Sequence, residues 1–150
     1  MSLESKINDD IKKAMLAREK EKLEALRAVK TALLVAKTEK GAGDTITEDA
    51  EIKILQRLVK QRKESAAIYE ESGRKELADK ESFEASVIEE YLPEQMSDEQ
   101  LTSVIKKIVD QVGAKGMADM GKVMGIASKE LAGKAEGKAI ADKVKAILNS

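Results

Sequence analysis

Almost nothing in this 150-residue chain interrupts a helix, since Pro93 is its only proline. Proline is the residue that helix interiors tolerate least, whereas Ala, Leu, Lys and Glu, which dominate here, favour helix most. Aromatic residues, which favour strands, make up only 2% of the chain. We therefore predict an all-α protein.

Apolar residues recur at intervals of three and four near the N-terminus, the spacing that places them on one face of a helix. Two stripes predict two amphipathic helices that meet near residues 17–20. The stripes consist of Leu3, Ile7, Ile11 and Met15, and of Leu23, Leu26, Val29, Leu33 and Ala36. Residues 41–44, Gly-Ala-Gly-Asp, then break the pattern.

Two further helices follow, and the first of them has a clear start and stop. Thr47 stands before the acid-rich residues 48–51, as an N-cap stands before an acidic first turn, and Gly73 offers a stop. We expect these helices to pack antiparallel with the first two. Their apolar positions are Ile54, Leu55, Leu58, Val59, Ala66 and Tyr69 in the third helix, and Leu77, Phe83, Val87 and Ile88 in the fourth, over residues 74–90.

The sequence around Pro93 predicts a boundary between two lobes. The residue before a proline disfavours the helical conformation, so we place the boundary at residues 92–96. Residues 97–100, Ser-Asp-Glu-Gln, have the pattern of a capping box that starts a new helix. We predict an N-terminal helical lobe over residues 1–92 and a C-terminal lobe over residues 93–150. The C-terminal lobe is expected to hold three short helices, over residues 98–112, 119–132 and 136–148.

Four stretches of the chain resemble the GatB/YqeY domain family. They are AIYEESGRKELADKE at residues 67–81, EASVIEEYLPEQM at 84–96, MGKVMG at 120–125 and GKAEGK at 133–138. The resemblance covers essentially the whole chain and implies a helical fold of two lobes. In GatB proteins a related module holds tRNA beside a catalytic body that amidates misacylated Glu-tRNA or Asp-tRNA. The resemblance therefore implies a stand-alone module that binds tRNA. Glu136 departs from the family pattern, which usually has Asp, although either acid favours a helix start.

Local charge points to a candidate RNA-binding surface in the C-terminal lobe. Residues 115–150 carry seven basic and four acidic side chains. Glycine exposes backbone N–H groups at a helix start and lysine adds positive charge, and both can hold phosphate groups. Alternatively, the glycines permit close helix packing and the lysines only solvate an outer face. The candidate RNA-binding residues are Gly121, Lys122, Gly133, Lys134, Gly137 and Lys138.

A second basic stretch lies on the predicted third helix. It could extend a track for RNA, but a polar face opposite apolar residues is what any surface helix displays, and we favour that interpretation. Its members are Lys53, Arg57, Lys60, Arg62 and Lys63.

The chain lacks cysteine and histidine, which excludes disulfides, thiolate nucleophiles, Cys/His zinc sites and the usual proton carrier at neutral pH. Adjacent acids such as Asp9 and Asp10 diverge by about 100° on a helix and make poor metal chelates. Neither Ser65 nor Ser128 stands in the strained turn of a serine nucleophile. We therefore expect no catalytic residues, no metal and no cofactor in this chain, and no amidotransferase activity by the chain alone.

The net charge and the lengths of the apolar runs indicate where in the cell the protein is expected. A net charge of -1 excludes a protein that coats nucleic acid indiscriminately. The longest apolar run, residues 32–36, is far below the ~20 residues that cross a membrane, and the N-terminus lacks an apolar signal core. We expect a cytoplasmic protein without a membrane partner.

Two functions fit these features. The first is a module that binds tRNA or another structured RNA. The second is a helical protein–protein interaction module with an apolar groove between the lobes, where methionines supply adaptable contacts. Those methionines are Met117, Met120 and Met124. We expect the aromatic residues to lie in the core instead of stacking on bases; they are Tyr69, Phe83 and Tyr91.

Overall fold

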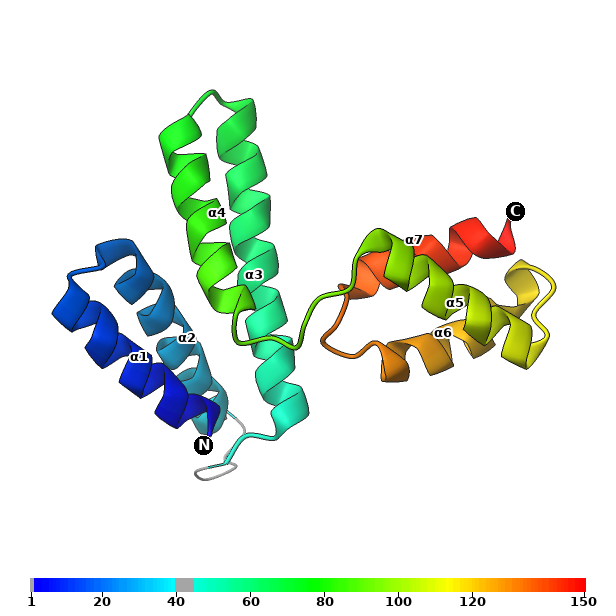
Figure 1. Ribbon diagram of the computed structural model, residues 1–150, viewed down its shortest axis with the longest axis horizontal. Coiled ribbons are helices and arrows are strands. Elements are labelled where there is room, and N and C mark those ends of the chain that lie inside the picture. The colour runs from blue at the N-terminus through cyan, green and yellow to red at the C-terminus, as the bar shows by residue number, and fades with distance from the viewer. Residues whose placement is uncertain (1, 40–44) are drawn as a thin grey trace. The chain divides into compact units, whose positions relative to one another are not determined.

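The computed structural model describes residues 2–39 and 45–150 (Figure 1). All regular structure in this part of the chain is helical, which confirms the predicted all-α class. The predicted break at residues 41–44 lies outside the described residues. The helices form two compact units, Met1–Leu92 and Pro93–Ser150. The elements in chain order are α1 (Leu3–Ala17), α2 (Lys20–Glu39), α3 (Glu48–Glu71), α4 (Lys75–Glu89), α5 (Asp98–Val112), the 3-10 turn η1 (Met117–Asp119), α6 (Met120–Glu130) and α7 (Gly137–Leu148).

Local hydrogen bonds set the two ends of α1. The Ser2 hydroxyl accepts a hydrogen bond from the Ser5 amide at 3.1 Å, as an N-cap does. Arg18 ends the helix in the left-handed conformation with a φ of 58°, and its amide donates to the carbonyls of the last turn. The chain therefore turns between α1 and α2 where the apolar stripes predicted the junction.

α3 and α4 form an antiparallel hairpin (Figure 1). The Thr47 hydroxyl accepts a hydrogen bond from the Ala50 amide at 3.2 Å, and three acids lie in the first turn of α3. Gly73, with a φ of 74°, follows the end of α3. Both the N-cap and the stop predicted for this helix are confirmed. α2 packs against α4 as well as α1, which joins the two hairpins of this unit.

The N-terminal unit has one apolar core to which all four helices contribute. Its buried members are Ile7, Ala14, Ala25, Leu26, Val29, Leu33, Ile54, Leu55, Leu58, Val59, Ala85, Val87 and Ile88. Three residues of the predicted stripes are exposed instead, namely Met15 at 53%, Leu77 at 40% and Phe83 at 41%. Phe83 lies two residues before the buried Ala85, and two residues turn a helix by about 200°. The core prediction was therefore wrong for Phe83, because its side chain faces away from the core.

Tyr91 is the aromatic residue that best matches the prediction of a core position. Its ring packs against the core, and its hydroxyl donates a hydrogen bond to the Asp10 carboxylate on α1. The Lys6 Nζ atom lies 5.4 Å from the centroid of the same ring. Burial, with a further contribution from the Asp10 hydrogen bond, raises the pKa of Tyr91. The hydroxyl therefore stays protonated and links the end of α4 to α1. Tyr69 is half-buried.

The C-terminal unit consists of three helices around its own core. The predicted capping box is confirmed, since the Ser97 hydroxyl accepts from the Gln100 amide at 3.2 Å and the Gln100 side chain accepts from the Ser97 amide at 3.0 Å. The bounds of α5, α6 and α7 lie within two residues of the predicted ones, whereas the turn η1 was not predicted. The buried core residues are Leu101, Ile105, Ile108, Val123, Ala127, Leu131, Ile140, Val144 and Leu148.

Candidate nucleic-acid interface

The starts of α6 and α7 have neither a side-chain cap nor an acid in the first turn, unlike those of α3 and α5. Their N-cap positions are occupied by Asp119 and Glu136, and neither side chain makes a cap hydrogen bond. The first amide N–H groups of a helix have no partner within it, and the helix dipole makes this end attractive to anions. Both helix starts therefore attract a phosphate group, although at α6 the Met120 amide already donates to the Met117 carbonyl of η1.

At the start of α6, Gly121 and Lys122 are both exposed. The Asp119 carboxylate accepts a hydrogen bond from the Lys115 amide at 3.0 Å in place of capping the helix. A Cβ atom added at Gly121 would meet no atom within 4 Å, so helix packing does not require glycine there. The structure thus gives Lys122 an exposed position beside an uncapped helix start.

The turn between α6 and α7 contains Gly133 and Lys134. Gly133 is buried and has a φ of 78°, a conformation that favours glycine, and its carbonyl accepts a hydrogen bond from Gln95 Nε2 at 2.7 Å. The Lys134 carbonyl accepts a hydrogen bond from the Met96 amide at 2.9 Å. These hydrogen bonds fix the backbone of the turn, while the Lys134 side chain is exposed.

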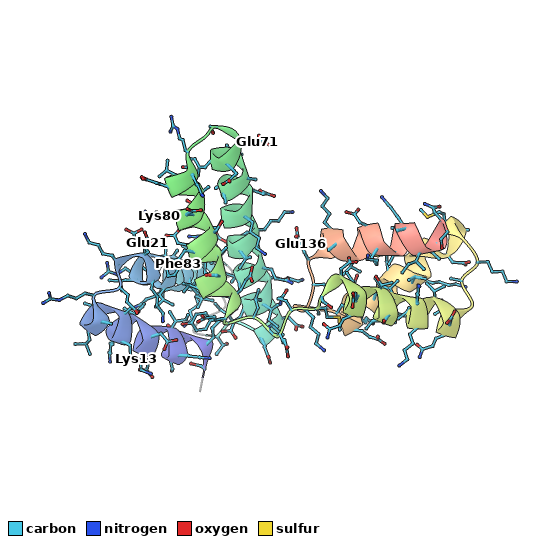
Figure 2. All side chains as sticks on the ribbon, turned by 45° about the horizontal axis from the view of Figure 1, so that its top comes forward. Lys13, Glu21, Glu71, Lys80, Phe83 and Glu136 are labelled. Carbon is cyan, nitrogen blue, oxygen red and sulfur yellow. The ribbon has the colours of Figure 1, made fainter. Side chains whose placement is uncertain are left out.

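At the start of α7, Gly137 and Lys138 are exposed residues of the first turn. Glu136 directly precedes them at the N-cap position (Figure 2), although its side chain makes no cap hydrogen bond. A Cβ atom at Gly137 would meet no atom within 4 Å. Close packing therefore does not explain the glycine at this position, and the same holds for Gly121.

The six candidate residues form two groups. α6 and α7 are joined by a short turn and run antiparallel (Figure 1), so their starts lie at opposite ends of the pair. α6 has 11 residues, which corresponds to a length of ~16 Å at the helical rise per residue. The surface therefore offers two separate places for phosphate groups. Gly121 and Lys122 lie at one end, and Gly133, Lys134, Gly137 and Lys138 lie at the other.

Neighbouring charges modify the positive balance of this lobe. Lys143 Nζ lies 2.7 Å from the Asp98 carboxylate, so this lysine links α7 to α5. Glu94 and Glu99 line, together with Lys134, a hollow of ≈ 600 Å³ within the C-terminal unit. An RNA backbone at Lys134 would therefore have to approach from the side away from these two acids.

Two of the five basic side chains on α3 form ion pairs within the N-terminal unit. Arg62 Nε lies 3.6 Å from the Glu84 carboxylate, and Lys63 Nζ lies 2.7 Å from the Glu89 carboxylate, both on α4. Lys53 and Arg57 instead line a hollow between α2 and α3. Two of the five basic side chains thus bind α4, which weakens the case for a continuous RNA track on this helix.

The three methionines of the alternative function have different surroundings. Met117 is 42% exposed, whereas Met120 and Met124 are half-buried and pack against the core of the C-terminal unit. Core packing therefore accounts for two of the three positions.

Within residues 2–39 and 45–150, no group of three or more Asp, Glu, His or Cys side chains could hold a metal ion. The helices of the same ranges include none that is long and apolar enough to cross a membrane.

The chain has recognisable relatives. The sequence profile of a family described as Yqey-like protein matches residues 4–148, and so includes both groups of candidate residues. A protein of Clavispora lusitaniae named altered inheritance of mitochondria protein 41, mitochondrial, is 30% identical to the chain over 115 residues. These residues cover 75% of the chain and 66% of the relative, so the chain spans slightly less than two thirds of that relative's length.

Proposed function

Because the chain belongs to the YqeY-like protein family, we propose that it is a non-catalytic module that binds tRNA or another structured RNA. The observation that carries the proposal is the pair of uncapped helix starts at α6 and α7, each with an exposed lysine in its first turn. Backbone amides and lysine side chains bind phosphate oxygens whatever the base sequence. The proposed contact is therefore with the RNA backbone.

The two groups of candidate residues suit a folded RNA. Because they lie at opposite ends of α6, a single RNA would have to present phosphates to both places at once. Structured RNA is recognised mostly by shape and by phosphate and sugar contacts. The C-terminal unit also contains no aromatic residue on which an unpaired base could stack. The expected ligand is thus recognised by its backbone shape.

A helical protein–protein interaction module is the second candidate function, and the exposed Met117 favours it. An association with a tRNA-dependent amidotransferase rests on the GatB resemblance alone. In that case the chain would hold tRNA for an enzyme that supplies the catalytic groups. The relative from Clavispora lusitaniae is mitochondrial by name, and the cytoplasmic location expected for this chain stays a prediction.

Titration of the full chain with tRNA over a series of salt concentrations tests the proposal. The triple variant Lys122→Ala/Lys134→Ala/Lys138→Ala should bind tRNA more weakly, and its salt slope should be smaller by about one unit for each phosphate group that the variant no longer neutralises. All three lysines are exposed, so helicity and Tm should stay nearly unchanged. Retention of total cellular RNA, followed by sequencing and by competition with an unrelated duplex, would identify the class of RNA.

A matched control removes three exposed lysines of the N-terminal unit, as Lys12→Ala/Lys13→Ala/Lys75→Ala. This variant has the same net charge as the first and should keep its tRNA affinity. Equal affinity and salt slope in wild type and the first variant would refute the site. Absence of RNA affinity at low salt would refute the function and leave the protein-interaction module.

A further inference from the structure

A hollow of ≈ 480 Å³ lies between α2 and α3 in the N-terminal unit. Its volume falls within the range of pockets that bind small molecules, about 300–1,000 Å³. Most of its lining is apolar, and half of the apolar lining residues are alanines. The apolar lining residues are Ala32, Val35, Ala36, Ile46, Ala50 and Ile54.

Two cations on one side of α3, Lys53 and Arg57, line the same hollow. Residues four apart on a helix are neighbours, and like charges at this spacing destabilise the helix. Neither side chain forms an ion pair with another residue in the described ranges, whereas Arg62 and Lys63 on the same helix both do. An anion bound at this edge would relieve the repulsion and gain two charge-assisted contacts.

The acid Glu39 gives the two ends of the hollow different charge. It lies at the end of α2, next to the connection with α3, whereas Arg57 is the lining residue farthest along α3 from that connection. A negatively charged group is therefore repelled at one end of the hollow and attracted at the other. The apolar alanine and isoleucine side chains lie along the length between them.

We propose that this hollow binds a small anionic amphiphile, namely a free medium-chain fatty carboxylate. The carboxylate contacts Arg57 and Lys53, and the alkyl chain lies against the alanines of α2 and α3. The hollow extends along about two turns of α2, from Ala32 to Glu39, and almost three turns of α3, up to Arg57, which is ~10–15 Å at the helical rise. One pair of cations towards one end of an apolar length matches a ligand with a single anionic group and a single alkyl chain.

The test titrates the full chain with decanoate, followed by the methyl NMR signals of alanine and isoleucine and by calorimetry. Saturable binding should shift the signals of Ala36, Ala50 and Ile54. Decanol, which has the chain without the charge, and acetate, which has the charge without the chain, should each bind at least five-fold more weakly. The variant Lys53→Gln/Arg57→Gln should lower decanoate affinity about ten-fold, as expected from two exposed ion pairs.

Two further variants distinguish binding of decanoate in the hollow from nonspecific electrostatic attraction to the protein. Lys12→Gln/Lys13→Gln removes the same charge from exposed positions of α1 (Lys13 is labelled in Figure 2) and should leave decanoate affinity unchanged. Ala36→Leu should block the hollow and lower affinity at least five-fold while helicity is retained.

Three results would overturn the proposal. They are non-saturable binding of decanoate, equal decreases of affinity in the two charge variants, and signal shifts confined to residues outside the hollow. If an acidic amphipathic peptide bound there and decanoate did not, the hollow would be a site for a protein helix and the proposal would again be wrong.

Discussion

Glu84 is the one buried charged residue among the described residues, with 7% of its surface exposed. It lies on α4, and Arg62 of α3 faces it with Nε at 3.6 Å and donates a hydrogen bond from another guanidinium nitrogen to the Leu58 carbonyl at 3.2 Å. Burial raises the pKa of Glu84 above its ordinary value of 4.5, although the Arg62 charge acts in the opposite direction. The ion pair therefore offsets only part of the cost of burying the carboxylate.

The raised pKa of Glu84 gives a pH dependence with a defined sign. Between the ordinary and the raised pKa the folded state binds more protons than the unfolded state, so the free energy of unfolding falls as pH rises. Glu84→Gln removes this contribution. Urea unfolding at several pH values from about 4 to 7 should show the wild type losing stability relative to the variant as pH rises. Glu89→Gln, on the same helix, controls for the loss of a negative charge, and a pH-independent difference between wild type and Glu84→Gln would contradict the argument.

Gly133 and Gly125 respond differently to the same substitution. Gly133 has a φ of 78°, where a side chain costs about 1–2 kcal/mol, so Gly133→Ala should lower the free energy of unfolding by this amount. Gly125 lies inside α6, and a Cβ atom there meets nothing within 4 Å. Gly125→Ala should therefore raise the free energy of unfolding by up to about 1 kcal/mol. Chemical denaturation of both variants measures the difference, and effects of the same sign would show that the assigned backbone conformation at Gly133 is wrong.

At the scale of elements, the helix starts are of two kinds: some are capped by side chains of the protein, and others are proposed to bind phosphate. α3 and α5 have hydroxyl caps and acidic first turns, so side chains of the protein satisfy those N–H groups. At the starts of α6 and α7 no side chain makes a cap hydrogen bond and the first turn has no acid.

Glu136→Asp tests whether the uncapped start of α7 matters. The shorter carboxylate is a better cap and should stabilise the protein by about 0.5–1 kcal/mol. Because it occupies the N–H groups and brings the negative charge closer to the place where phosphate is proposed to bind, it should also lower tRNA affinity several-fold. Thermal unfolding and tRNA binding are measured together, with Glu136→Gln as the variant that removes charge without adding a cap. Unchanged affinity in a stabilised Glu136→Asp variant would argue against a phosphate at this helix start.

Sequence alone predicted the helices well, because their starts and stops depend on local signals such as Thr47, Ser97 and Gly73. Exposure of Phe83 was not predictable in this way, since it depends on which side of α4 faces α2 and α3. The division of the candidate lysines into two groups follows from the antiparallel packing of α6 and α7. That packing could have been inferred from the short connection, whereas the uncapped starts required side-chain geometry at Asp119 and Glu136.

At the scale of the whole molecule, net charge does not single out either unit as the site of RNA binding. The chain has 27 basic and 28 acidic residues, and residues 93–150 contain nine basic and eight acidic ones. The remaining residues 1–92 therefore contain 18 basic and 20 acidic ones. Neither unit has a strong field, so any RNA affinity has to come from the positions of a few lysines and helix starts.

We propose that the two units also fold independently, which makes the location of binding testable. Each unit has its own buried core, and domains of about 55–65 residues can fold alone, although marginally. The Pro93–Ser150 fragment retains the hydrogen bonds of Gln95 and Met96 with the turn after α6. It should therefore show a helical circular dichroism spectrum and a cooperative unfolding transition.

The tRNA affinity of the fragment of residues 93–150 should lie within about threefold of that of the full chain, because the fragment contains both helix starts and all three candidate lysines. Surface electrostatic contacts also act locally at physiological salt. The fragment of residues 1–92 should fold and show no comparable affinity. A full chain with a protease site inserted between Leu92 and Pro93 serves as the control, since cleavage after folding separates the units without disturbing the Gln95 and Met96 hydrogen bonds. If tRNA stays with the N-terminal fragment after cleavage, the phosphate contacts proposed at α6 and α7 are wrong. If both fragments are folded and neither binds, the RNA requires surfaces from both units, and the assignment to one unit has to be abandoned.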